Sequence, residues 1–129
     1  MSKITVSTKK APAAIGPYCQ AVKYADFVFT SGQIPIDPAS GDIAPGGVEA
    51  QTRQALRNLE EVLNAAGASL ATVLKTTLFI KNMSDFAQIN NIYASFFGAE
   101  PPARSCVEVA RLPKDVLVEI EAIAFIPRP

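Results

Sequence analysis

The chain has 129 residues, in which 12 Lys and Arg balance 12 Asp and Glu, and it contains no histidine. This length suits one compact domain over residues 1–129 with a sizeable core. The balanced charge gives no general attraction to nucleic acid or to a membrane surface. The missing histidine excludes the usual imidazole base, the Ser–His and Cys–His nucleophile pairs and most zinc sites.

Signals for a membrane or for secretion are not evident in the sequence. No apolar run approaches about 18 residues, and residues 1–14 lack the apolar stretch of a signal peptide. We therefore expect a cytoplasmic protein, or an organellar one if the source is a eukaryote. In such a compartment Cys19 and Cys106 are expected to be free thiols rather than a disulfide.

Three short strands are predicted in the first part of the chain, at residues 4–6, 20–24 and 27–31. The last two are expected to be joined by a tight turn at Ala25-Asp26. The segment 32–47 is rich in Pro and Gly and is a predicted loop. A loop of this length is expected to be either packed or functional.

Two amphipathic helices and an intervening strand are predicted next. Apolar residues recur at helical spacing over 48–66, and Gly67 is a plausible stop. The run 73–81 is rich in β-branched and aromatic residues, which favours a strand. A second helix is predicted over 85–97, with Ser84 as its N-cap and Gly98 at its end.

Two final strands are predicted on either side of a turn at residues 112–115. Side chains alternate between the faces of a strand, so Arg104 and Cys106 share one side of the first strand. If the two strands pair as neighbours, these residues and Glu119 can lie on one side of the sheet, away from the main core. A guanidinium and a carboxylate there would suit a small anionic substrate.

The predicted order of elements is β-β-β-α-β-α-β-β. Two helices can cover only one face of a sheet of five or six strands. The other face would still show Leu117, Ile123 and Phe125, and an open apolar face is typical of a partner surface. We therefore expect an oligomer whose sheets pack together, with a site near a subunit boundary.

Each candidate site residue in the final strands has a structural alternative. Arg104 suits a carboxylate bound through two parallel hydrogen bonds, or an ion pair with Glu119 or Glu121. Glu119 suits a general base acting on a water, or the partner in that ion pair. Cys106 would need a lowered pKa to act as a nucleophile, so a passive role is favoured.

Three candidates lie elsewhere in the sequence. Tyr18 suits a side chain that closes over a substrate, or a partly buried aromatic. Gly32 suits a close approach of the backbone to a ligand, or a turn. Lys75 lies within an apolar strand, where it is either a site cation or, more commonly, a side chain that extends its ammonium into water.

Characteristic segments occur in order along the whole chain. They are IGPY at 15–18, FTSGQIP at 29–35, KTTLF at 75–79, PARSCVEVA at 102–110, LP at 112–113 and VEIEA at 118–122. With this order and spacing the chain resembles the Rid (YjgF-like) family, and most closely its reactive intermediate deaminase branch. The resemblance implies a chorismate-mutase-like α+β fold with a mixed sheet. It also implies a homotrimer with a central barrel and three sites between subunits.

The resemblance further implies an activity and a set of site residues. The activity is hydrolysis of reactive enamines and imines, chiefly 2-aminoacrylate and 2-aminocrotonate, to 2-oxo acids and ammonia, without cofactor or metal. The implied sources are pyridoxal-phosphate-dependent serine and threonine dehydratases. Arg104 matches the arginine that binds the substrate carboxylate, and Glu119 matches the glutamate that positions water. Further matches in or near the cleft are Tyr18, Ser31, Gly32, Asn90, Cys106, Lys75 and Phe86.

Two other functions stay open at this point. One is a non-catalytic or chaperone-like trimer that binds 2-oxo acids in the same cleft. The other is a ribonuclease or translation inhibitor, an activity ascribed to some relatives. Neutral net charge, the lack of histidine and the lack of a patch of basic and aromatic residues disfavour a nucleic-acid partner.

Overall fold

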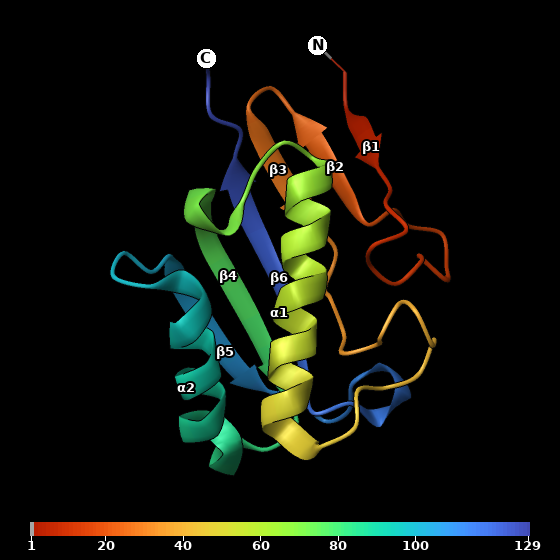
Figure 1. Cartoon of the computed structure of the whole chain (residues 1–129), viewed down its shortest axis with the longest axis vertical. Helices are drawn as coiled ribbons and strands as arrows, with labels where there is room; N and C mark the ends of the chain where they lie inside the picture. Colours follow the sequence, from red (N-terminus) through yellow and green to blue (C-terminus); the bar gives the residue numbers. More distant parts are fainter. Residues whose placement is uncertain (1) are drawn as a thin grey trace.

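The computed structural model describes residues 2–129, and its centre is one six-stranded sheet with both helices on the same face (Figure 1). The strands are β1 (Ile4–Val6), β2 (Ala21–Tyr24), β3 (Phe27–Thr30), β4 (Val73–Ile80), β5 (Ala103–Glu108) and β6 (Val118–Phe125). They lie in the order β1-β2-β3-β6-β4-β5. Only β4 and β5 are parallel, so the expected mixed sheet is confirmed.

The two helices are α1 (Gly47–Ala65) and α2 (Phe86–Phe97). Both follow the predicted ranges to within one residue. Gly67 has a φ of +90°, a conformation that glycine adopts without a steric penalty, so the predicted end of α1 is confirmed. None of the helices that the structure describes is long and apolar enough to cross a membrane.

The predicted cap of α2 is wrong. Ser84 lies inside a short 3₁₀ turn, η2 (Met83–Asp85), and makes no capping hydrogen bond to the helix. The carboxylate of Glu108 in β5 instead accepts a hydrogen bond of 2.7 Å from the backbone N–H of Met83. A side chain from a distant strand thus provides the hydrogen-bond acceptor for the backbone N–H at the start of η2. A local sequence pattern does not reveal such a contact.

The condition that the last two strands pair as neighbours is not met, because β4 lies between β5 and β6. Parallel strands need a crossover connection, and α2 provides one between β4 and β5. In the register, Arg104 is opposite Thr76, which is fully buried on the helix side. Glu119 is opposite Phe79 and therefore lies on the other face. Arg104, Cys106 and Glu119 do not share one side of the sheet.

The core lies between the sheet and the two helices. In β6 the alternation is as predicted, because Val118, Ile120, Ala122 and Ala124 are all buried beneath the helices. From α1 the core receives Leu56, Leu59, Val62 and Leu63, and from α2 it receives Ile89, Ile92 and Tyr93. This packing fixes α2 over β4 and β5, where it contributes side chains to the site described below.

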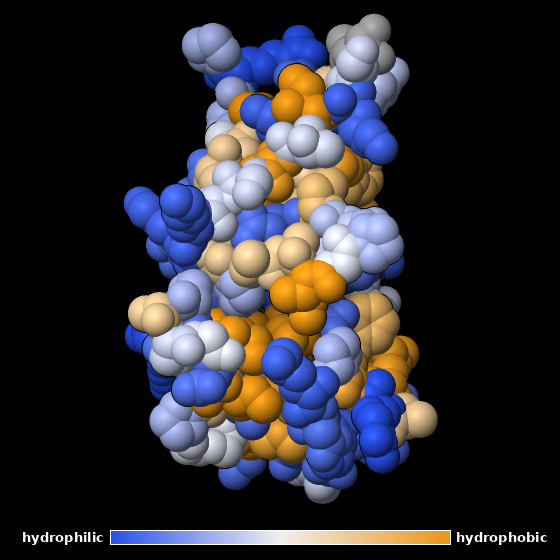
Figure 2. Space-filling view, turned by 90° about the vertical axis from the view of Figure 1, so that its right-hand side faces the viewer, coloured by the Kyte–Doolittle hydropathy of each residue, from blue (hydrophilic) through white to orange (hydrophobic). Residues whose placement is uncertain are grey.

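The face of the sheet away from the helices is open and partly apolar. Phe27, Phe29, Ile123 and Phe125 are each at least 36% exposed, and Leu117 is half-buried. Paired positions bring Phe27 beside Phe125 and Phe29 beside Ile123. The side of the molecule seen in Figure 2 also gathers hydrophobic residues, mainly in its lower half.

Candidate functional site

Arg104 projects from β5 towards α2 and is held by three of its side chains. One guanidinium nitrogen donates a 2.7 Å hydrogen bond to Oδ1 of Asn90. The guanidinium carbon lies 5.3 Å from the ring centre of Phe86 and 4.9 Å from that of Tyr93. Both distances suit cation–π attraction. Half-buried between these groups, Arg104 has a fixed position before any ligand is present.

Tyr93 is a part of this arrangement, although it was not among the predicted site residues. Its hydroxyl shares a buried 2.7 Å hydrogen bond with the hydroxyl of Thr76 in β4. Burial raises the pKa of Tyr93, against smaller opposing effects of Thr76 and of the charge on Arg104. The neutral Tyr93 side chain therefore bonds to β4 through its hydroxyl and supports the guanidinium of Arg104 with its ring.

Cys106 lies two residues after Arg104, on the same side of β5. It is half-buried against the hydrophobic core, and burial raises the pKa of its thiol despite the nearby charge of Arg104. A raised pKa disfavours the thiolate, so the passive role is favoured over a nucleophilic one. Cys19 and Cys106 are both free thiols, as expected.

Arg104 has no carboxylate partner within the part of the chain that the structure describes. The ion pairs between residues 2–129 are Lys81 with Asp115 and Arg128 with Asp26. The alternative of a structural ion pair between Arg104 and a glutamate of β6 is therefore wrong for the single chain. The guanidinium keeps hydrogen-bonding capacity for a ligand.

A second group of candidate residues surrounds Glu119 on the open face. Its side chain is half-buried, and burial raises the pKa of its carboxyl, with a further contribution from the like charge of Glu121. Gly32 lies directly against it, and any side chain at that position would overlap the carboxylate. A side chain at position 32 would therefore displace the flexible end of Glu119, and the close approach of this backbone to a ligand stays a prediction.

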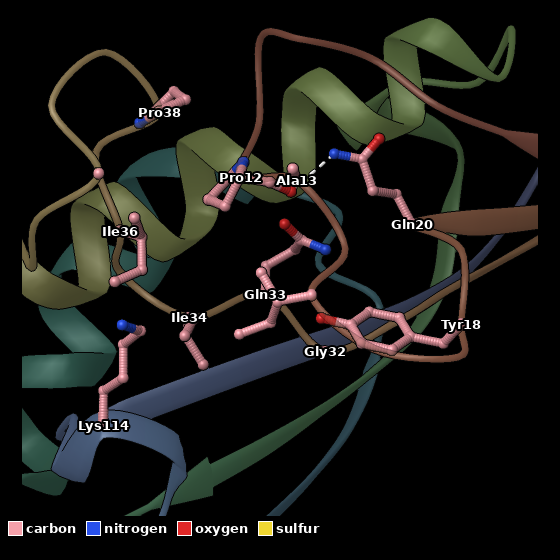
Figure 3. Close-up of a pocket in the computed structure, with 12 residues that line it drawn as sticks. Pro12, Ala13, Tyr18, Gln20, Gly32, Gln33, Ile34, Ile36, Pro38 and Lys114 are labelled. Atoms are coloured by element: carbon pink, nitrogen blue, oxygen red, sulfur yellow. Dashed lines mark hydrogen bonds between the residues drawn. The ribbon is translucent and has the colours of Figure 1, made fainter.

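Ser31 and Tyr18 lie next to this group. The Ser31 hydroxyl donates a 2.7 Å hydrogen bond to the carbonyl of Cys19, and its backbone N–H donates one to Gln20. These bonds hold the segment that carries Tyr18, which is 52% exposed. Tyr18 and Gly32 line a cavity of about 320 Å³ (Figure 3).

Lys75 joins neither group. It is exposed on the open face, where it lines a separate hollow of about 210 Å³ with Thr77 and Glu121. Across residues 2–129, no group of three or more His, Cys, Asp or Glu side chains is arranged to hold a metal ion.

The structure therefore brings the predicted site residues together as two separate groups. Arg104 and Glu119 lie on opposite faces, two strands apart and displaced along the sheet by three residues. With usual strand spacings, their Cα atoms are about 14 Å apart. A small substrate cannot contact both side chains within one chain. We call the residues around Arg104 (Phe86, Asn90, Tyr93 and Cys106) the arginine group, and Tyr18, Ser31, Gly32 and Glu119 the glutamate group.

Comparison with known proteins relates this arrangement to a family. The model of the endoribonuclease L-PSP family matches residues 8–126. An Escherichia coli K12 protein named 2-iminobutanoate/2-iminopropanoate deaminase is 54% identical over 127 residues, which cover 96% of this chain and 98% of that one.

Two crystal structures resemble the fold closely. A Yersinia pestis protein of the conserved Rid protein family has a TM-score of 0.94 and 49% identity, and the match covers 97% of this chain and all of the other (100%). Escherichia coli TdcF with bound serine has a TM-score of 0.91 and 50% identity, with coverage of 95% and 98%.

Proposed function

The chain belongs to the endoribonuclease L-PSP (Rid) family, and from this premise we propose that it is a hydrolytic deaminase of reactive enamines and imines. The 54% identical relative named for imine deamination supports this activity. So does the serine bound by TdcF, because serine carries its carboxylate and its amine nitrogen on the same carbon atom, as the proposed substrates do. Those substrates are 2-aminoacrylate, 2-aminocrotonate and their imines, which leave pyridoxal-phosphate-dependent dehydratases.

The observation that carries the proposal is the state of Arg104. Two aromatic rings and one amide hold its guanidinium, and it pairs with no carboxylate between residues 2 and 129. Arg binds carboxylates through two parallel hydrogen bonds, and a prepositioned group loses little freedom on binding. An arginine held in this way suits the carboxylate of a small imino acid.

The reaction needs only modest help from the protein. The enamine tautomerises to an imine, water adds to the imine carbon, and the carbon–nitrogen bond of the adduct breaks. Ammonia leaves, and a 2-oxo acid remains. Arg104 orients the substrate and draws charge from the carboxylate beside the reacting carbon. Glu119 orients the water, accepts its proton as the carbon–oxygen bond forms, and returns a proton to the nitrogen that leaves as ammonia.

We propose that the site forms between subunits of a homotrimer. The two groups lie on opposite faces of one sheet, so one substrate reaches both only if they come from different chains. The arginine group at the β5 edge of one subunit then faces the glutamate group of the next. Such a head-to-tail contact closes into a ring, and the exposed Phe27, Phe29, Ile123 and Phe125 provide apolar surface to bury.

The direct test couples the protein to a serine or threonine dehydratase and follows release of the 2-oxo acid. Wild-type protein is expected to accelerate this release. Arg104→Ala removes two charged hydrogen bonds to the substrate and should lower kcat/KM by about 100-fold or more. Arg111→Ala is the matched control, because Arg111 is an exposed arginine outside both groups.

Near-normal turnover by a folded Arg104→Ala protein would contradict the role of Arg104. No acceleration by the wild type, together with saturable binding of 2-oxobutanoate, would contradict catalysis and favour the non-catalytic binding function. Circular dichroism of each variant separates these outcomes from a failure to fold.

A further inference from the structure

The cavity beside Tyr18 is larger than the proposed reaction requires, and most of its lining belongs to neither group of the site. It lies where the loop over residues 12–18 meets the loop over 32–41 and the 3₁₀ turn η3 (Pro113–Asp115) (Figure 3). Its volume is about 320 Å³. Much of its wall is hydrocarbon, contributed by Pro12, Ile15, Ile34, Ile36 and Pro38.

Two buried glutamines line this cavity, and they differ in how their amides are used. Gln20 is 3% exposed and its amide is fully engaged: it accepts a 2.7 Å bond from Thr8 and donates to the carbonyls of Thr8 and Pro12. Gln33 is 5% exposed. Its only side-chain hydrogen bond within residues 2–129 is a long 3.4 Å contact to the carbonyl of Ser31.

The amide of Gln33 lines the cavity and makes one long hydrogen bond within residues 2–129, so it keeps donor and acceptor capacity for a ligand there. Its backbone is fixed by two hydrogen bonds with Ile120 on β6, which direct the side chain inward. An amide offers two N–H donors and one oxygen acceptor, and one long bond uses only a small part of this capacity. Gln20 explains the local loop structure, whereas Gln33 has no comparable structural task.

Lys114 brings a positive charge to the same cavity through a strained turn. Both Lys114 and Asp115 have a φ of 55°, in the left-handed region that residues with a side chain rarely adopt. Lys81 stabilises this turn, since its ammonium lies 3.0 Å from each carboxylate oxygen of Asp115. Lys114 takes part in neither ion pair formed within residues 2–129, and its side chain extends towards Ile36 at the cavity (Figure 3).

The polar groups that line the cavity and are free to donate are the ammonium of Lys114, the amide of Gln33 and the exposed hydroxyl of Tyr18. Three donors around an apolar wall select a ligand that carries acceptors, and the cation selects a negative one. The volume lies at the low end of the range of about 300–1,000 Å³ for small-molecule pockets.

We propose that this cavity is a second binding site, specific for a small organic acid with an apolar chain. The carboxylate binds Lys114, the chain lies against the prolines and isoleucines, and an acceptor such as a keto oxygen bonds to the amide of Gln33. The site adjoins the glutamate group through Tyr18 and Gly32 but does not involve Arg104. It therefore goes beyond the proposed reaction, and its occupancy can be measured without turnover.

The test measures binding of 4-methyl-2-oxopentanoate, a 2-oxo acid with a branched apolar chain. Binding is monitored by heteronuclear NMR during a titration of the full chain. Wild-type protein is expected to show saturable shifts of residues around the cavity. Lys114→Met removes the charge and should raise the Kd for this acid by about tenfold. Lys9→Met, an exposed lysine that does not line the cavity, and Arg104→Ala should leave binding at the cavity unchanged.

A second variant and a second ligand test the chemistry. Gln33→Met keeps the size of the side chain and should remove the preference for 4-methyl-2-oxopentanoate over 4-methylpentanoate, which lacks the keto group. The neutral ketone 4-methyl-2-pentanone should bind wild type at least about tenfold more weakly than the 2-oxo acid.

The proposal is overturned if the ligand shifts no residue of the cavity, or if Arg104→Ala abolishes binding while Lys114→Met retains it. That second result would place the acid on the arginine group. Loss of imine hydrolysis without loss of this binding would count only against the proposed reaction, so the two failures are distinguishable.

Discussion

At the scale of single residues, Arg104 and Glu119 are prepared in opposite ways. Arg104 is supported by favourable contacts to its charged form, from two aromatic rings and the Asn90 oxygen. Glu119 is half-buried beside Gly32 and Glu121, so its charged form is disfavoured. A carboxylate whose charged form is destabilised has a raised pKa and binds a proton more tightly, which suits a general base.

This cost predicts that Glu119→Gln makes the protein more stable but less active. The pKa of Glu119 is raised in the fold, so the folded state binds this proton more tightly than the unfolded chain does. Wild-type stability should therefore fall as pH rises from the usual glutamate pKa through the raised value. The glutamine variant should be more stable above that window, and the difference should vanish below it.

Thermal unfolding between acid and neutral pH measures this difference, and the dehydratase-coupled assay measures the loss of turnover. Glu100→Gln is the control, because Glu100 is an exposed carboxylate outside both groups. A Glu119→Gln protein that is less stable than wild type at neutral pH would show that the carboxylate has a structural role instead.

At the scale of secondary structure, the loop that carries Gly32 and Gln33 depends on α1. Asn58 of α1 is 1% exposed, and its amide donates hydrogen bonds of 3.0 and 2.9 Å to the carbonyls of Ile34 and Ile36. The first part of the long Pro- and Gly-rich segment is thus packed against α1, which is one of the two outcomes expected for a loop of this length, whereas residues 38–42 are exposed. One helix side chain fixes the wall of the cavity.

Asn58→Ala should consequently destabilise the protein by about 2–4 kcal/mol, because two buried carbonyls lose their partner. Asn64→Ala is the matched control, since Asn64 is an exposed asparagine on the same helix. Urea unfolding measures both changes. A loss no greater than that of the control would mean that the loop holds its shape without this contact.

The same scale shows what sequence alone could and could not predict. Periodicity located α1 and α2 to within a residue, and alternation assigned the buried side of β6 correctly, because both depend on local patterns. The condition that β5 pairs with β6 was not met, since strand neighbours are chosen by long-range packing. Strand β4 lies between them, and its register places Arg104 opposite Thr76 and Glu119 opposite Phe79, on opposite faces of the sheet.

For the candidate residues as well, local sequence patterns identified some positions, whereas contacts made by long-range packing were missed. Arg104 and Glu119 were identifiable as individual residues, from a charged side chain in an apolar strand and from the family resemblance. Tyr93 was not, because its contact with Arg104 exists only once α2 lies over β5. Gln33 and Lys114 were missed for a similar reason: their shared cavity is formed by loops far apart in the sequence.

At the scale of the whole molecule, the separation of the two groups and the open sheet face have one common explanation. A single chain leaves large apolar side chains exposed on that face, among them Phe27, Phe29, Ile123 and Phe125, and the arginine group at the edge of the sheet faces away from it. Assembly would bury the exposed apolar side chains, and it would complete the site by bringing the arginine group of one subunit to the glutamate group of another. The central claim is therefore that each site takes Arg104 from one subunit and Glu119 from its neighbour.

Mixing two inactive variants tests this claim most directly. Arg104→Ala and Glu119→Gln proteins are unfolded together in equal amounts, refolded and assayed for imine hydrolysis, with each variant refolded alone as the control. Sedimentation first establishes that the product has three times the 13.7 kDa mass of one chain. In random trimers, every mixed ring contains one site with both native residues, so about one quarter of wild-type activity should return. If the mixed trimers stay as inactive as the separate variants, the two residues do not act together across a subunit boundary.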